Sequence, residues 1–278
     1  MRWPPFEHVF FDCDSTLTTV EGIDVLAETL GKRVPVETLT QAAMDGEIDL
    51  DEAYAKRLET LRPTRRQVLD LRHVYKRTMV EDAAAVIAAL QALGHKVYII
   101  SGGLAEPVAE FGISLGIPRE RIRAVHIAYD ELSGQWWERS QAEDQRYLTS
   151  TEGALTVSDG KAQIVRELIG DQRGRSMLIG DGISDYYAGE AVDLFVGFGG
   201  VVARPKVRQA APVYLECQSL APILALAGGP GALRILSTWT MQYQSLGSKA
   251  SYLIHKGVVS FNHEQLETKF RRAFLDPQ

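Results

Sequence analysis

Three short apolar runs in this chain each end in a cluster of polar residues or glycine. The runs are HVFF at residues 8–11, KVYII at 96–100 and SMLI at 176–179, and the clusters that follow are Asp12-Cys13-Asp14, Ser101-Gly102-Gly103 and Gly180-Asp181-Gly182. Runs of this length are typical of buried strands. The segments between them carry apolar residues at helical spacing, and strands that alternate with helices favour a parallel sheet with helices on both faces. Because ligands bind beyond the carboxyl ends of such strands, the clusters should meet in one crevice.

The remaining periodicity divides the chain into segments. We expect further strands at 123–129 and 131–138, joined by a Ser-Gly turn, and at 194–198. Residues 21–80 have helical periodicity and almost no strand signal, which interrupts the alternation. The sequence therefore predicts an α/β protein in which residues 1–18 and 80–228 form a core domain, residues 19–79 an inserted helical cap, and residues 229–278 a helical C-terminal extension of unknown role.

The composition limits which binding partners and which cellular compartment we expect for this protein. The formal net charge is −6 and no long run of lysine or arginine occurs, so a nucleic-acid partner is not expected. The longest apolar run, residues 220–228, is too short to span a bilayer, and the first residues lack the layout of a signal peptide. The two cysteines, Cys13 and Cys217, match no disulfide or metal pattern. We therefore expect a soluble cytoplasmic protein without membrane contacts.

The predicted crevice is rich in carboxylates. Asp12, Asp14, Asp181 and Asp185 lie at or just after strand ends, and so many acids repel one another unless a cation lies among them. Oxygen ligands favour Mg²⁺, which retains several waters and binds substrate phosphates well. An aspartate carboxylate is also a competent nucleophile toward phosphorus. We expect Asp12 to attack and to bind the metal, and Asp14 to transfer protons.

Hydrogen-bond donors and a cation complete the predicted phosphate site. Ser101 and the backbone of Gly102 and Gly103 can donate to phosphate oxygens at a helix N-terminus, and Lys161 begins a further helix. Each of these motifs alone is usually structural, as a turn, a helix cap or a solvated charge. Their occurrence in order, each at a strand end or a helix start, favours the functional interpretation.

The predicted cap carries charges in unusual places. Arg57 falls within an apolar stripe formed by Leu50, Tyr54 and Leu61. Its guanidinium therefore needs a partner, which is an acid of the protein, solvent at the rim or the carboxylate of a substrate. Glu21 is either an ordinary acid of a first helical turn or the partner of a substrate ammonium. Together, Glu21 and Arg57 would bind the two charges of a zwitterion.

Several other side chains have two interpretations. Met44 is either core filler or a pocket residue. Trp136 and Trp137 lie near a predicted turn, and because neighbours on a strand point in opposite directions, at most one should face the site. In the extension, RILSTWTMQYQSLG is apolar enough for a docking helix, and KFRRAF is basic and amphipathic. We expect them to pack back on the protein or to join copies of the chain, as in a homodimer, rather than to dock a different partner.

The combination of motifs resembles the haloacid dehalogenase superfamily of phosphatases. DCDST, ISGG, Lys161 and GDGISD resemble, in order, the four motifs of that superfamily. VEGIDVLAE and AAMDGEIDLDEAYAKRLETL resemble the helical insert of its phosphoserine phosphatase branch, and VGFGGVVARPKVRQAAPVYL is similar to the stretch after the fourth motif. The resemblance covers residues 7–225.

The resemblance implies a Rossmann-like core and an aspartyl-phosphate intermediate. It gives Asp12 the role of nucleophile and Asp14 that of acid and base. It implies Mg²⁺ held by Asp12, the backbone carbonyl of Asp14 and Asp181, with Asp185 nearby. It places the phosphate against Ser101, Gly102, Lys161 and Ser184, and the amino-acid end of the substrate against Glu21, Met44, Arg57 and Arg204.

The chain departs from that branch at three places. Ser184 stands where the branch usually has Asn or Thr, Leu50 replaces an aromatic residue of the cap, and residues 229–278 extend beyond the usual end. The activity that the resemblance implies is Mg²⁺-dependent hydrolysis of O-phospho-L-serine to serine and phosphate. The alternatives are a related phosphatase for a sugar-acid phosphate or phosphoethanolamine, a protein that is phosphorylated as a signal, and a scaffold that works through its extension.

Overall fold

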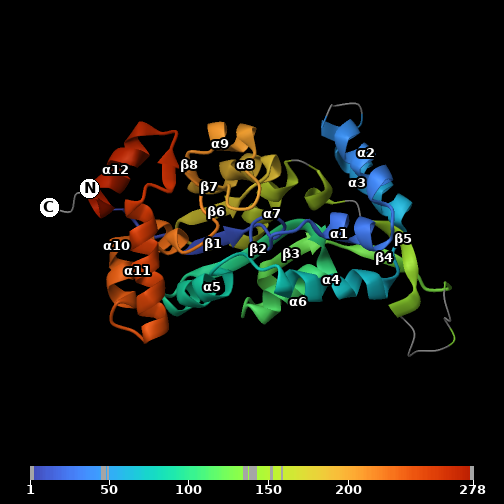
Figure 1. The fold of residues 1–278 in the computed structure, drawn as a ribbon, viewed down its shortest axis with the longest axis horizontal. Helices are drawn as coiled ribbons and strands as arrows, with labels where there is room; N and C mark the ends of the chain where they lie inside the picture. The colour runs from blue at the N-terminus through green and yellow to red at the C-terminus, as the bar shows by residue number, and fades with distance from the viewer. Residues whose placement is uncertain are drawn as a thin grey trace.

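A computed structural model describes residues 3–44, 48, 50–133, 137, 143–150, 153–157 and 159–275. A central sheet carries helices on both faces, with a helical region at one end and further helices at the other (Figure 1). Over the described residues the sheet has seven strands, in the order β3-β2-β1-β6-β7-β8-β9. Neighbouring strands pair in parallel except β8 and β9, which are antiparallel. The strands are β1 His8–Phe11, β2 Lys96–Leu104, β3 Ile122–Val125, β6 Ser176–Gly180, β7 Leu194–Phe198, β8 Val213–Leu215 and β9 Val259–Phe261.

The sheet is buried on both faces, which confirms the predicted α/β fold with a mostly parallel sheet. Side chains alternate between faces along a strand, so Val9 and Phe11 of β1 join one apolar cluster and Phe10 joins another. The first cluster includes buried residues of α5 (Ala83–Ala92) and α6 (Ala105–Ser114). The second includes buried residues of α7 (Gly160–Ile169), α8 (Ile183–Ala188) and α9 (Pro205–Ala210). Helices from both clusters thus fix the strand ends on which the polar motifs lie.

A block of four helices follows β1 and lies beyond the carboxyl end of the sheet (Figure 1). The helices are α1 Gly22–Thr29, α2 Arg33–Met44, α3 Leu50–Leu61 and α4 Arg65–Arg77. Their apolar faces form a third cluster, which includes Leu26, Leu58 and Leu71 and also Leu104 at the end of β2. Ion pairs connect α4 to α6 of the core, Arg65 to Glu106 at 2.6 Å and Arg72 to Glu110 at 2.9 Å. These ion pairs therefore hold the helical block against α6, the helix that follows β2.

The hairpin that we predicted at 123–138 is wrong in its pairing. Residues 123–129 divide between β3 in the central sheet and β4 (Ile127–Asp130), and β4 pairs in antiparallel fashion with β5 (Arg146–Ser150). The chain turns at Asp130, whose carboxylate accepts from the backbone of Leu132 at 3.0 Å. Of the second predicted strand, residues 131–133 form this turn, and residues 134–136 and 138 lie outside the described residues. Trp136 lies outside the described residues, and the Trp137 side chain is 64% exposed.

The C-terminal helices pack back on the core, as one of our two interpretations predicted. They are α10 Pro222–Leu236, α11 Met241–His255 and α12 Glu264–Phe274. Phe270 and Phe274 of α12 contact the ring of Trp3 near the N-terminus, with centroids 5.6 and 6.3 Å away. This part of the chain also supplies a strand, β9, which we did not predict. The boundary that we drew at 228/229 falls at a kink in α10, where Gly229 has a non-helical backbone with a φ of +71°. Over the described residues, the helices are too short or too polar to cross a membrane.

Candidate active site

The polar clusters of three strands meet in one cavity, as predicted. The cavity has a volume of about 250 Å³ and lies between the carboxyl ends of β1, β2 and β6 and the helical block. Its lining includes these predicted residues: Asp12, Asp14, Glu21, Arg57, Ser101, Gly102, Lys161, Asp181, Ser184, Asp185 and Arg204. The sequence therefore identified most of the wall of this cavity before any contact was known.

Lys161 pairs with two carboxylates at the bottom of the site. Its ammonium lies 2.9 Å from Oδ1 of Asp12 and 2.7 Å from Oδ1 of Asp185, and all three side chains are buried. Burial disfavours the charged form of Lys161, but the two carboxylates outweigh it and raise the pKa of the ammonium. The phosphate end of the cavity therefore keeps a positive charge beside Asp12.

Glycines allow this arrangement at two positions. A Cβ on Gly180 would lie 2.2 Å from the carboxylate carbon of Asp185, so that carboxylate packs directly on the end of β6. A Cβ on Gly160 would lie 1.6 Å from the carbonyl oxygen of Ala154. The short helix η3 (Ala154–Thr156) thereby packs against the start of α7, just before Lys161.

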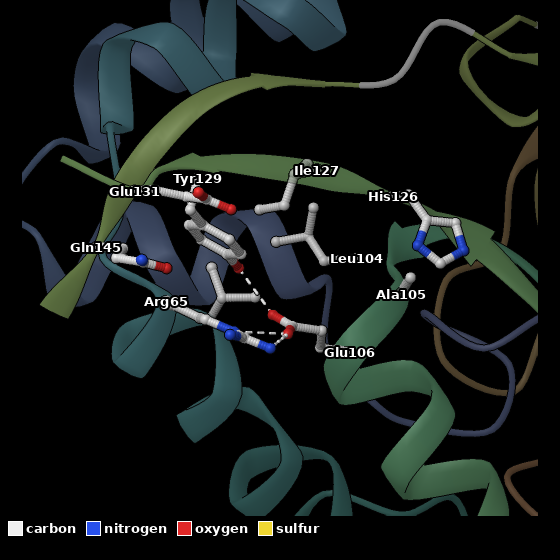
Figure 2. A pocket seen from close by; sticks show the side chains of 10 residues that line it. Arg65, Leu104, Ala105, Glu106, His126, Ile127, Tyr129, Glu131 and Gln145 are labelled. Carbon is white, nitrogen blue, oxygen red and sulfur yellow. Dashed lines mark hydrogen bonds and ion pairs between the residues drawn. The ribbon is translucent and has the colours of Figure 1, made fainter. Parts of the chain in front are cut away.

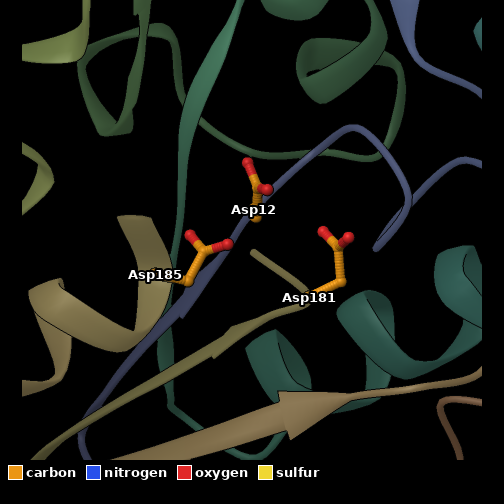
Figure 3. A group of neighbouring side chains, drawn as sticks. All are labelled: Asp12, Asp181 and Asp185. Carbon is orange, nitrogen blue, oxygen red and sulfur yellow. The ribbon is translucent and has the colours of Figure 1, made fainter. Parts of the chain in front are cut away.

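Asp12, Asp181 and Asp185 form a compact carboxylate group (Figure 3). One oxygen of each lies within 4.8 Å of the others, and all three residues are buried. Burial and the nearby charge of Asp185 raise the pKa of Asp12 well above its usual range and that of Asp181 to about 6. A cation among the three would relieve this repulsion, and a donor set of oxygens alone suits a hard divalent ion. The residues present thus fit a metal site.

Asp181 also accepts from two other side chains. Nε of Arg204 lies 2.8 Å from Oδ2 of Asp181, and the hydroxyl of Thr16 lies 3.5 Å from Oδ1. A terminal nitrogen of Arg204 is 3.4 Å from Glu21. Arg204 therefore bridges the carboxylate group and the acid that we assigned to the amino-acid end of the substrate.

Asp14 is half-buried and lies outside the carboxylate group. Its Oδ2 accepts from the backbone N–H of Gly22 at 3.0 Å, and the hydroxyl of Tyr75 also lies beside this carboxylate. Burial and the charge of Glu21 raise the pKa of Asp14 to about 7. A carboxyl group with this pKa is able both to release and to accept a proton near neutral pH.

The phosphate-binding motif differs from the prediction in one respect. We expected β2 to end at residue 101 and a helix N-terminus to begin near Gly102 and Gly103. Instead, β2 runs to Leu104 with an irregular register after Ile100, and α6 begins at Ala105. The hydroxyl of Ser101 accepts from the N–H of Gly103 at 2.9 Å. The Ser101 hydroxyl proton and the Gly102 backbone remain as the donors that line the cavity.

Two charged side chains of the helical block line the opposite wall. Glu21 accepts from the hydroxyl of Ser15 at 2.8 Å. Arg57 donates from Nε to the carbonyl of Ala53 at 3.3 Å and makes no ion pair with any described residue. Burial lowers the pKa of Arg57, which indicates a guanidinium that has lost solvent without gaining a carboxylate.

Some of the lining was not predicted as a site, and one predicted residue is not described there. Ile23, Tyr54 and the η3 segment with Val157 also line the cavity. Tyr54 lies three residues before Arg57 on the same face of α3, which is a signal that helical spacing contained. The η3 segment had no such signal. The backbone of Met44 ends α2, but its side chain lies outside the described residues, as does that of Leu50.

A second cavity of about 250 Å³ lies between α4, α6 and the β4–β5 hairpin (Figure 2). Its strongest polar groups satisfy one another. Glu106 accepts from Arg65 at 2.8 Å and from the hydroxyl of Tyr129 at 2.9 Å. Leu104 lines both cavities. This second cavity is therefore a structural junction that supports the end of β2.

Comparison with known proteins agrees with this geometry. A family model for haloacid dehalogenase-like hydrolases matches residues 6–193 of the sequence. The phosphoserine phosphatase of Drosophila melanogaster is 35% identical over 209 residues, which cover 74% of this chain and 73% of that protein. The phosphoserine phosphatase of Mus musculus is 30% identical over 208 residues, which cover 74% of this chain and 88% of that protein.

A solved structure has the same fold. It is described as a phospho-aspartyl intermediate analogue of phosphoserine phosphatase, and it superposes with a TM-score of 0.65 at 23% identity. The match covers 79% of this chain and 98% of that chain.

Proposed function

This chain belongs to the haloacid dehalogenase-like hydrolase family, and we propose that it is a Mg²⁺-dependent phosphomonoesterase that hydrolyses O-phospho-L-serine to L-serine and phosphate. One observation carries the proposal. A single cavity joins a nucleophilic carboxylate and a buried cation at one end to Glu21 and an arginine without a carboxylate partner at the other. Phosphoserine has a phosphate, an ammonium and a carboxylate to match these groups.

In the first half of the reaction, a carboxylate oxygen of Asp12 bonds to phosphorus and the ester oxygen of serine leaves. Lys161, Ser101 and the Gly102 backbone hold the phosphate oxygens, and Lys161 balances the charge that gathers on them. Asp14 gives its proton to the leaving oxygen, because a serine alkoxide is a poor leaving group. The products of this half are L-serine and an acyl phosphate on Asp12.

In the second half, Asp14 accepts a proton from a water molecule, whose oxygen bonds to phosphorus while the bond to Asp12 breaks. The phosphate leaves, and Asp12 and the protonated Asp14 are restored. A Mg²⁺ ion held by the carboxylates of Asp12 and Asp181 and the carbonyl of Asp14 would offset the negative charge of the phosphate in this site. Asp185 would keep Lys161 and the end of β6 in position beside them.

A related substrate is a second candidate, and one observation favours it. Glu21 already accepts from Ser15 and lies 3.4 Å from Arg204, so it does not depend on a substrate ammonium for a partner. A phosphorylated hydroxy acid such as phosphoglycerate, a sugar-acid phosphate without an amine, would leave no charge of the site unpaired. The two candidates share the carboxylate and differ only in the amine.

A panel of three substrates tests the proposal. Phosphoserine has both charges, phosphoglycerate lacks the amine and phosphoethanolamine lacks the carboxylate. An unpaired charge in a desolvated site costs about 2–5 kcal/mol, so phosphoethanolamine should be hydrolysed with a kcat/KM at least about 30-fold lower than that of phosphoserine. Released phosphate is the readout. Preference for phosphoethanolamine would exclude phosphoserine as the substrate, and preference for phosphoglycerate would favour the second candidate.

Arg57→Ala, measured on the same panel, assigns the preference to one side chain. It should reduce hydrolysis of phosphoserine and phosphoglycerate and leave phosphoethanolamine nearly unchanged. Arg66→Ala is the matched control, since that arginine lies on α4 with a side chain 53% exposed and outside the cavity. Equal losses on all three substrates would remove Arg57 from the carboxylate site.

A further inference from the structure

We propose that Tyr54 is a specificity-determining residue of this site, whose hydroxyl binds the carboxylate of the substrate together with Arg57. The proposal deepens the proposed function and rests on it, because it assumes that a carboxylate-bearing phosphate enters the cavity. It goes beyond the predicted site, in which Tyr54 was only part of the apolar stripe of its helix.

The placement of Tyr54 gives the first argument. Tyr54 and Arg57 lie three positions apart on α3, so both side chains emerge from one face of the helix. Both line the cavity, and the guanidinium carbon of Arg57 lies 5.7 Å from the centre of the Tyr54 ring. A ring in this position contacts the guanidinium face and limits its rotation, so the guanidinium edge remains for a planar acceptor.

The unsatisfied donors give the second argument. The hydroxyl of Tyr54 has no hydrogen-bond partner in the described ranges, although its side chain is packed against the apolar cluster of the helical block. Arg57 uses only Nε, toward the carbonyl of Ala53. Both side chains are half-buried and line the cavity, so their free donors are within reach of a ligand that enters it. Two neighbouring donors without acceptors on one wall of a cavity therefore indicate a ligand that brings acceptors.

The chemistry of the acceptor follows from the donors. A hydroxyl beside a guanidinium matches a carboxylate, which accepts two bonds from arginine and a third from another donor. Burial raises the pKa of Tyr54, so its hydroxyl stays protonated and donates across the range in which the enzyme would work. The guanidinium of Arg57 would repel an ammonium on this wall, so the amine of the substrate belongs on the side of Glu21.

Tyr54→Phe tests the proposal, because it removes one oxygen and leaves the ring beside Arg57. For phosphoserine and phosphoglycerate, we expect KM to rise about tenfold, the factor that corresponds to about 1.4 kcal/mol, with kcat nearly unchanged. For phosphoethanolamine, KM should not change. Tyr147→Phe is the matched control, since Tyr147 is buried in the same apolar cluster but does not line the cavity, and it should leave all three KM values at the wild-type level.

The outcomes separate this proposal from the proposed function. Wild-type KM values for Tyr54→Phe on both carboxylate substrates would overturn the role of Tyr54, and so would an equal rise of KM on all three substrates. Wild-type preference for phosphoglycerate would overturn phosphoserine as the substrate while leaving the Tyr54 test intact. If the wild type shows no preference for a carboxylate, both proposals fail. Thermal unfolding of each variant shows that the comparison is made between folded proteins.

Discussion

At the scale of single residues, the ammonium of Lys161 contacts both Asp12 and Asp185. The proposed nucleophile thus lies where its charge is partly balanced before a phosphate arrives, and one oxygen of Asp12 also accepts from the N–H of Cys13 at 2.8 Å. These contacts orient the carboxylate. Nothing else among the described lining residues combines a carboxylate, a neighbouring cation and a position at the end of β1.

Asp12→Asn should fold and lose nearly all turnover. The amide keeps the shape of the carboxylate and its contact with Cys13, but it is a far weaker nucleophile. Phosphate release with Mg²⁺ present measures the activity, and circular dichroism checks the fold. A variant that keeps a substantial part of the wild-type rate would contradict covalent catalysis by Asp12.

Asp14→Asn should affect substrates according to their leaving groups. A serine alkoxide needs protonation and an aryloxide hardly does, so phosphorylation of the enzyme by phosphoserine should slow by about 100-fold or more. The same step with an aryl phosphate should change little. Rapid-quench measurement of the phosphoenzyme compares the two. Equal losses in this first step would show that Asp14 is not the acid.

Removal of divalent metal should abolish activity. A chelator leaves Asp12, Asp181 and Asp185 to repel one another, and Mg²⁺ should restore both the rate and the thermal midpoint, since an ion that binds only the folded protein stabilises it. Ca²⁺ should raise the midpoint but not the rate, because its larger and looser coordination does not fix the reacting groups. Full activity in Ca²⁺, or no effect of the chelator, is the contrary result.

At the scale of elements, η3 forms one wall of the cavity, and its position there depends on Gly160. It contacts α7 through the position where Gly160 lacks a Cβ, and Leu155 and Thr156 line the cavity from there. The phosphate end is therefore surrounded by β1 and by two elements that follow each other much later in the chain, η3 and α7.

Gly160→Ala should push η3 away from α7. We expect a loss of about 1–3 kcal/mol in the free energy of unfolding, as for overpacking, and a higher KM for every phosphate substrate. Gly153→Ala is the matched control at the other end of the same segment, because a Cβ there meets nothing within 4 Å and its φ of −177° suits any residue. Unchanged KM values in Gly160→Ala would mean that η3 does not shape the site.

At the scale of the whole molecule, the C-terminal region is bound to the core close to the junction with the helical block. Lys249 of α11 lies 2.7 Å from Glu81 and 2.5 Å from Asp82, just before α5. Ser219 donates to the same carboxylate of Asp82 at 2.6 Å. Because β9 also pairs with β8, we expect this region and the core to unfold together.

Lys249→Met tests that expectation. Asp82 has a side chain only 21% exposed and would keep only the Ser219 hydroxyl, so loss of its charged partner should lower the free energy of unfolding by about 1–3 kcal/mol. Urea denaturation should still show a single transition at a lower midpoint. Arg271→Met is the matched control, since it breaks an exposed pair within α12, which is worth less than about 1 kcal/mol. Two separate transitions would show that the C-terminal region folds independently.

Local sequence pattern was sufficient to predict the strands that carry the site and most of the residues in its wall. Short apolar runs depend only on local pattern, so β1, β2, β6 and β7 were predicted from spacing, together with polar residues near strand ends and a helix start: Asp12, Asp14, Ser101, Gly102, Lys161, Asp181 and Asp185. Ser184 and Arg204 were expected only from the family resemblance. The same local reasoning placed Arg57 in an apolar stripe and required a partner for it.

The contacts between residues that are distant in the chain could not be predicted from local pattern. The pairing of β4 with β5 and the addition of β8 and β9 to the sheet depend on long-range hydrogen bonds that strand patterns do not encode. The contact of Arg204 with Asp181 and Glu21, and the unsatisfied donors of Tyr54 and Arg57, depend in the same way on how the helical block closes over the strand ends. A side chain's partners are set by packing between distant segments, which local periodicity does not specify.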